Sequence, residues 1–308
     1  MILLTAAPVS RMPGAVPTAP VVRAAAHLLR DRGERVRVLV PAAESSGWPD
    51  GVDLHIGALT DPASFAAAAS GAERLFLAGL VGTSLERLRE LTEALVRNRV
   101  RRVVTLDSHG SDFDDGVSQE TWQWAAFEKT LDRHRIGRVS LRPTAVMAHA
   151  VTGGYPIPGS AAVTAIRAGR EVAEYLPEAP YAFIHEDDLA EIAVNLLLDD
   201  RLHGTVDVSG TTVTASERVA ALAAALDTEV TMTELTFEQA VQRWREEGWP
   251  EDTIAVTLYA TAAFAADPDN STVREQEKTA RKLLGREPRT FREWARTFAP
   301  HPTEHTAT

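Results

Sequence analysis

The sequence has no cysteine among its 308 residues, and this absence excludes several kinds of chemistry. Without thiols the chain has no disulfide, no thiolate metal site and no cysteine nucleophile. An excess of basic charge is also missing, because 43 acidic residues stand against 32 basic ones and the formal net charge is −11. An acidic surface repels phosphate backbones, so the composition argues against nucleic acid as a partner.

Long hydrophobic runs are missing too. No apolar stretch approaches the roughly 20 residues that a membrane-spanning helix needs. The opening residues, MILLTAAPVS, have no charged segment before their short apolar run, unlike a secretory signal peptide. We therefore expect a cytoplasmic protein with no membrane partner, and a polar tail over residues 300–308.

What is present is a regular alternation of strand-like and helix-like segments over residues 1–142. This spacing is typical of βαβ units and a parallel sheet with right-handed crossovers. It predicts an α/β fold with a doubly wound, Rossmann-like parallel sheet in the order 3-2-1-4-5-6. The predicted strands are 2–5, 35–40, 53–56, 74–77, 103–106 and 139–142, and the predicted helices are 19–32, 62–70, 84–97 and 122–134.

After residue 142 the pattern loosens. We expect a smaller α+β C-terminal lobe over residues 143–299 that binds substrate and is interleaved with the core. The predicted helices there are 189–198, 216–226, 237–247, 253–265 and 290–298, and the predicted strands are 205–209 and 230–235.

Four segments of the second half carry a family resemblance: LRPTAVMAHA (141–150), FIHEDDLAEIAV (183–194), HGTVDVSGTTVT (203–214) and KLLGREPRTFREWA (282–295). With the order of segments along nearly the whole chain, they resemble the NmrA-like branch of the atypical short-chain dehydrogenase/reductases. The resemblance implies a Rossmann-like domain that usually binds NADPH or NADH. It also implies either a reductase of quinones or azo compounds, or a redox sensor without turnover.

The phosphate-binding turn of that family, TGATGxxG, is degenerate here. After the first predicted strand the chain reads TAAPVSRMPGAVPTAPVV (5–22), which is longer and contains four prolines. A proline has no backbone N–H to donate to a phosphate, and the turn depends on closely approaching glycines. If this loop still holds a cofactor, Thr5, Ala6, Ala7 and Gly14 are the residues that match the motif's position.

Two further dinucleotide contacts are also missing. Pro41, Ala42 and Ala43 stand after the second strand, where an acidic residue or an arginine would contact the adenosine ribose. After the third strand the family's GDL is replaced by GAL (57–59), and no tyrosine has a lysine four residues later. These joint losses favour a protein that uses no cofactor, with NADPH or NADH binding as the alternative.

The loop after the fifth predicted strand is the strongest candidate for catalysis, because ligands of doubly wound sheets bind beyond the carboxyl ends of the strands. Asp107, Ser108 and His109 open this loop, and His149 follows the sixth strand. A histidine beside carboxylates can act as a general acid or base near neutral pH. The alternative is an ordinary polar loop with Asx turns.

Other notable side chains have structural or pocket-lining interpretations. We expect His185 and Asp188 to be structural, with Asp188 capping the helix that follows. No His, Asp or Glu group has convincing metal-ligand spacing, so we predict no metal. Aromatic residues at helical spacing are usually core, but some are expected to line an apolar pocket. The predicted pocket residues are Trp122, Trp124, Met147 and Tyr155.

Three hypotheses follow for the function. The favoured one is a small-molecule enzyme that runs cofactor-independent acid–base chemistry on an apolar, possibly aromatic polyketide-like substrate: a cyclisation, dehydration or isomerisation. The second is an NAD(P)H-dependent reductase of quinones, azo compounds or carbonyls with an altered phosphate loop. The third is a noncatalytic ligand sensor. In each case the partner is a small molecule, and the protein is expected to be a monomer or homodimer.

Overall fold

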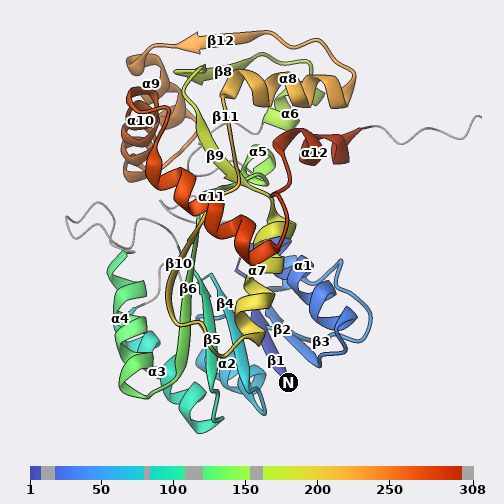
Figure 1. The fold of residues 1–308 in the computed structure, drawn as a ribbon, viewed down its shortest axis with the longest axis vertical. Helices are drawn as coiled ribbons and strands as arrows, with labels where there is room; N and C mark the ends of the chain where they lie inside the picture. The colour runs from blue at the N-terminus through green and yellow to red at the C-terminus, as the bar shows by residue number, and fades with distance from the viewer. Residues whose placement is uncertain (8–17, 80–83, 108–120, 153–161, 300–308) are drawn as a thin grey trace, which may run out of the picture.

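The computed structural model describes residues 1–7, 18–79, 84–107, 121–152 and 162–299, with only the backbone at 121–124 and 152. Two layers of helices enclose a large sheet in the lower half of Figure 1, and the C-terminal residues build most of the upper half. None of the described helices is long and apolar enough to cross a membrane.

The large sheet has seven parallel strands in the order β10-β6-β5-β4-β1-β2-β3. This confirms the predicted doubly wound sheet and adds β10 beside β6, so residues from the second half of the chain complete it. The central strands are buried on both faces, as expected for a parallel sheet covered by helices. The strands are β1 (Ile2–Thr5), β2 (Val36–Val40), β3 (Asp53–Ile56), β4 (Arg74–Ala78), β5 (Arg102–Leu106), β6 (Gly137–Pro143) and β10 (Gly204–Val208).

Helices cover both faces of the sheet. α1 (Thr18–Asp31) and α7 (Glu186–Leu198) pack together on one face, with α11 (Ser271–Leu284) against α7 and β10. α2 (Pro62–Ala69), α3 (Leu85–Arg97) and α4 (Thr121–Arg133) cover the other face.

Local sequence signals explain where these helices begin. The Asp61 side chain accepts hydrogen bonds from the backbone of Ala63 and Ser64, and Pro62 is the first residue of α2. In α3 a stripe of leucines at helical spacing is buried at Leu88, Leu91 and Leu95. Leu85 is the exception: it is 59% exposed because it lies in the first turn, at the outer edge of the layer.

The rest of the chain forms two small sheets and several helices. One sheet has the order β11-β9-β7 and the other pairs β12 with β8. The sequence did not predict β7, β8, β9, β11, α5, α6 or α11. The elements are β7 (Ala145–Val146), α5 (His149–Thr152), α6 (Ala162–Arg167), β8 (Val172–Tyr175), β9 (Tyr181–Ile184), β11 (Thr211–Val213), α8 (Ala215–Leu226), β12 (Met232–Leu235), α9 (Phe237–Glu246), α10 (Glu251–Ala266) and α12 (Phe291–Ala295). The division at residue 142 into two domains stays a prediction.

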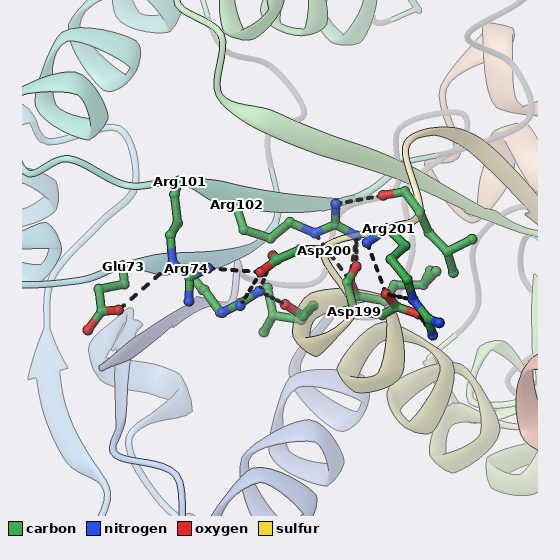
Figure 2. A network of polar contacts seen from close by, with 10 residues as sticks. Glu73, Arg74, Arg101, Arg102, Asp199, Asp200 and Arg201 are labelled. Atoms are coloured by element: carbon green, nitrogen blue, oxygen red, sulfur yellow. Dashed lines mark hydrogen bonds and ion pairs between the residues drawn. The ribbon is translucent and has the colours of Figure 1, made fainter.

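Two buried arginines hold the C-terminal end of α7 against the start of the strands (Figure 2). Arg102 of β5 donates to the carbonyl oxygens of Leu196 (2.6 Å), Asp199 (2.7 Å) and Leu202 (2.6 Å). Arg74 of β4 donates to the carbonyl of Leu197 and to both carboxylate oxygens of Asp200. The last carbonyls of a helix have no partner within it and carry partial negative charge, so the two guanidinium groups satisfy and neutralise this end.

The N-terminal end of α7 is held by the C-terminal segment, defined here as residues 285–295. His185, not Asp188 as predicted, caps the helix, because its Nδ1 accepts from the backbone N–H of Asp187. Asp188 is fully buried and accepts from the side chains of Arg286 and Arg289. Two of the segments that carry the family resemblance therefore contact each other.

We expect Arg102→Met to lower the free energy of unfolding by about 3 kcal/mol or more, because it removes the donors to the carbonyls of Leu196 and Asp199 at the end of α7 and of Leu202 beyond it. Urea unfolding followed by circular dichroism measures this. Arg201→Gln is the matched control in the same network, since the Arg201 side chain is 89% exposed and pairs only with Asp199 at the surface. Equal stability of the Arg102→Met variant and the wild type would contradict this role.

The contact between α7 and the C-terminal segment also predicts a pH dependence. Burial raises the pKa of Glu186, opposed by His185 and by the hydrogen bond from Trp294 Nε1 (2.8 Å). A raised folded-state pKa means that this carboxyl favours the folded state most below its unfolded pKa of about 4.5, and that the contribution is lost as the pH rises through the folded value. Glu186→Gln should therefore be more stable than the wild type at pH 7, and the difference should shrink toward pH 4 in urea unfolding.

Glu293 supplies the control of opposite sign within the same segment. Hydrogen bonds from the backbone and hydroxyl of Thr290 lower its pKa, so its ionised form favours the folded state. Glu293→Gln should destabilise the protein at pH 7, with the loss fading as the pH falls below about 4.5. If both variants change the free energy of unfolding in the same direction at pH 7, the pKa shifts do not determine their stability.

Candidate functional site

The carboxyl ends of β1 and β4 lie close together at the point where the strand order reverses. The Thr5 hydroxyl donates to the Ala78 carbonyl (2.9 Å) and accepts from the Ala78 N–H (3.0 Å). One step further, Gly79 has a φ of +91°, and a Cβ placed on it would lie 2.2 Å from the Ala7 Cβ. Only glycine fits there, so the segments that follow β1 and β4 are in direct contact where they leave the sheet.

A single hydroxyl group, that of Thr18, connects the end of β1 with the start of α1. Thr18 Oγ1, at the start of α1, accepts from the Ala7 N–H (2.9 Å) and donates to the Ala7 carbonyl (3.0 Å). Thr5 and Ala6 are buried. Gly14, with the rest of 8–17, lies outside the described residues.

An acidic side chain, Glu44, follows β2 just beyond the three residues at which the sequence suggested that none was present. Glu44 lies in the short 3-10 helix Ala42–Glu44, and its carboxylate pairs with Arg23 of α1 at 2.7 Å. Arg23 also donates to the Ser46 carbonyl and stacks over the Trp48 ring at 5.3 Å. A ribose contact is expected directly after the end of β2 at Val40, and the Glu44 carboxylate comes four residues after Val40.

The turn after β3 is held from α3. Arg87 is buried and donates through Nε (3.1 Å) and Nη2 (2.7 Å) to the carbonyl oxygen of Leu59. Gly57 donates its N–H to the Val40 carbonyl (2.8 Å), and a Cβ at this position would lie 2.6 Å from the Ser64 hydroxyl. The GAL turn is thus a packed structural turn.

Asp107 is a buried anchor at the end of β5. It is 1% exposed, and its carboxylate accepts from Ser140 Oγ (2.9 Å) and lies 3.5 Å from Arg142 Nε. Its N–H donates to the Leu141 carbonyl of β6 (2.9 Å). These contacts enclose the carboxylate between β5 and β6, and the catalytic role of Asp107 stays a prediction. Ser108 and His109 lie outside the described residues.

Of the remaining predicted site residues, some are buried and the others lie outside the described residues. His149 is 4% exposed and begins the short helix α5. Met147 is fully buried in the apolar core formed around β7, β9 and α12, so its thioether offers no accessible surface to a substrate. Tyr155 and the side chains of Trp122 and Trp124 lie outside the described residues. Within the described part of the chain, no group of three or more His, Asp or Glu side chains is placed to hold a metal ion.

Comparisons with known proteins give similarity in structure alone. No family model and no curated sequence matches the chain. It is similar to a triphenylmethane reductase of Citrobacter sp. complexed with NADP(H), with 15% identity and a TM-score of 0.69 over 97% of this chain and 100% of the other. An Escherichia coli NADPH-dependent quinone oxidoreductase complexed with NADPH has 17% identity and a TM-score of 0.67 over 96% and 98%. A Staphylococcus aureus nucleoside-diphosphate-sugar epimerase has 13% identity and a TM-score of 0.67 over 96% and 99%.

The chain has the Rossmann-like fold of these proteins. The similarity extends through the C-terminal elements, because nearly the whole of each chain is covered. The sequence-based preference for a protein without a cofactor gains no support from these comparisons, since two of the three similar structures contain NADPH or NADP(H).

The described residues fit a dinucleotide in part. α1 begins at the edge where Rossmann folds place the diphosphate, and Glu44 with Arg23 lies between α1 and β2, where the adenosine ribose is held. Against this, the Ala7 N–H and the Leu59 carbonyl are both engaged within the chain. The diphosphate contacts would therefore have to come from residues 8–17.

We expect Gly79→Ala to lower the free energy of unfolding by about 2 kcal/mol or more, because the added methyl group combines an unfavourable backbone conformation with overlap against Ala7. Gly169→Ala is the matched control: its φ is +62°, but nothing lies within 4 Å of the added Cβ. That variant should lose only about 1 kcal/mol, the backbone cost alone. Equal losses in chemical denaturation would show that the contact between the strand ends is not tight.

Proposed function

We propose that this chain is a reductase of small organic molecules that takes NADPH or NADH as its reductant. The observation that carries the proposal is the similarity of the entire chain, C-terminal elements included, to an NADPH-dependent quinone oxidoreductase and a triphenylmethane reductase. A shared nucleotide domain alone would leave the substrate side unmatched. The bound nicotinamide would supply a hydride equivalent, and the protein would bind and orient the two reactants.

The residues that would hold the cofactor follow from the edge geometry. The amino end of α1 and the loop 8–17 would face the diphosphate. Glu44 would accept from ribose hydroxyls, and Arg23 is the cation available for a 2′-phosphate. Because these two side chains neutralise each other, a bound 2′-phosphate would compete with Glu44 for the guanidinium of Arg23.

A second candidate function is the cofactor-independent acid–base enzyme, acting on an apolar substrate such as an aromatic polyketide. It is favoured by a specific observation: the Thr18 hydroxyl and the Arg87 guanidinium occupy backbone groups at the edge where a dinucleotide would bind. In this case His109 and His149 would be the proton-transfer groups, because an imidazole can both donate and accept a proton.

Titration of NADPH and NADH into the purified protein separates the two candidates. The quenching of the six tryptophans reports binding. The reductase proposal expects dissociation constants in the micromolar range, near −8 kcal/mol at 1 μM, and loss of the nicotinamide absorbance when quinones or triphenylmethane dyes are added. Dissociation constants above about 1 mM, or binding free energies weaker than about −4 kcal/mol, would contradict the reductase proposal and favour the acid–base enzyme.

Two arginine variants make the titration site-specific. Arg23→Gln should weaken NADPH more than NADH, because only NADPH carries the 2′-phosphate. Arg201→Gln, at the opposite edge of the sheet, should change neither dissociation constant. If Arg23→Gln raises the dissociation constants of NADPH and NADH equally, Arg23 does not bind the 2′-phosphate.

A further inference from the structure

The C-terminal half encloses a small cavity away from the edge that would hold a dinucleotide. It lies among β8, β9, α8, α9 and α10, the elements in the upper part of Figure 1. Its volume is about 30 Å³, which is room for two or three water molecules. Aromatic and hydroxyl side chains form most of its wall: Tyr175, Tyr181, Phe183, Trp244, Thr257 and Thr261.

Arg218 of α8 contributes the positive charge in this wall. The residue is 8% exposed, and its guanidinium lies 4.8 Å from the centre of the Phe183 ring. Its ion-pair partner, Glu174 Oε1, is 4.0 Å from Nη2, which is too far for a hydrogen bond. Among the described residues the Arg218 side chain donates no hydrogen bond, although a guanidinium has five N–H donors.

Two other buried arginines among the described residues, Arg102 and Arg87, are satisfied by hydrogen bonds. Arg102 donates to three carbonyl oxygens and Arg87 donates twice to one. Burial lowers the pKa of Arg218, and the charge of Glu174 opposes that shift only in part. A buried cation without hydrogen-bond acceptors is unfavourable unless a further group in the cavity supplies them.

We propose that this cavity binds the carboxylate group of a small organic acid, with the guanidinium of Arg218 as its partner. Two carboxylate oxygens need about the space of two water molecules and match the paired N–H groups of a guanidinium. The rings of Tyr175 and Trp244 would contact the apolar remainder of the acid. A doubly charged phosphate fits less well, because Glu174 lies 4.0 Å from Arg218 and would repel the second charge.

This site does not depend on the proposed reductase activity. The cavity is formed by none of the seven strands of the main sheet, so a failure to bind NADPH would leave it intact. Binding of an acid here can therefore be measured on the protein alone.

Saturation-transfer NMR with acetate as the probe tests the proposal at constant ionic strength, with acetamide as the neutral analogue of the same shape. We expect transfer to the acetate methyl group and none to acetamide. Arg218→Met should weaken acetate binding at least about tenfold. Glu174→Gln should tighten it by about tenfold, since it removes the nearby negative charge but keeps the shape. Inorganic phosphate should compete poorly.

The opposite effects of the two variants separate a binding site from a structural ion pair. A merely structural pair would make both variants less stable and leave acetate binding unaffected. If Arg218→Met does not fold, Arg218→Lys, which keeps the charge without the paired donors, should still weaken acetate binding severalfold while Glu174→Gln tightens it. No signal from acetate in the wild type, equal signals from acetate and acetamide, or an unchanged dissociation constant in Glu174→Gln would overturn the proposal.

Discussion

The arginine contacts at the C-terminal end of α7 are the interaction on which the rest of the structure depends. Arg74 and Arg102 begin adjacent strands, and their partners lie 94 to 126 residues later in the chain. They place α7 against the sheet beside α1. Because α7 runs antiparallel to the strands, its other end lies at their carboxyl edge. There Asp188 and Glu186 bind the C-terminal segment through Arg286, Arg289 and Trp294. One helix thereby joins the sheet to the C-terminal elements.

The sheet could be predicted from the sequence because its signals are local. Fully buried parallel strands have short apolar runs, and β1 has the predicted bounds for this reason. The edge strand β3, which is partly exposed, also has the predicted bounds. α11 was missed because its buried face contains Gln276 and Ala280 along with Val273 and Leu284, so its apolar stripe is weak. The strands β8 and β9 were missed because they lie outside the βαβ alternation of the first half, and their partners β12 and β11 come far along the chain.

The candidate site was less predictable than the fold, for a physical reason. The sequence identifies which residues follow a strand, but it does not show which neighbours enclose them. Asp107 was predicted as a catalytic candidate from its place after a strand, but its burial depends on Ser140 and Arg142, which the register of β5 against β6 brings beside it. Similarly, Asp188 resembles a helix cap in a local reading, and only the distant Arg289 shows its actual role. Glu44 could have been found by extending the search four residues beyond the strand.

The carboxyl edge of β1, β2 and β3 is held by side chains of the chain itself. Thr18 joins the start of α1 to Ala7 after β1, Glu44 binds Arg23 after β2, and Arg87 holds the turn after β3. Holding these groups in place in advance reduces the conformational entropy that a ligand would otherwise cost on binding. The same contacts also use donors and acceptors that a dinucleotide would need, which reduces the enthalpy that it could gain. The described part of this edge is therefore held by contacts within the chain, and the proposed dinucleotide would take its diphosphate contacts from residues 8–17.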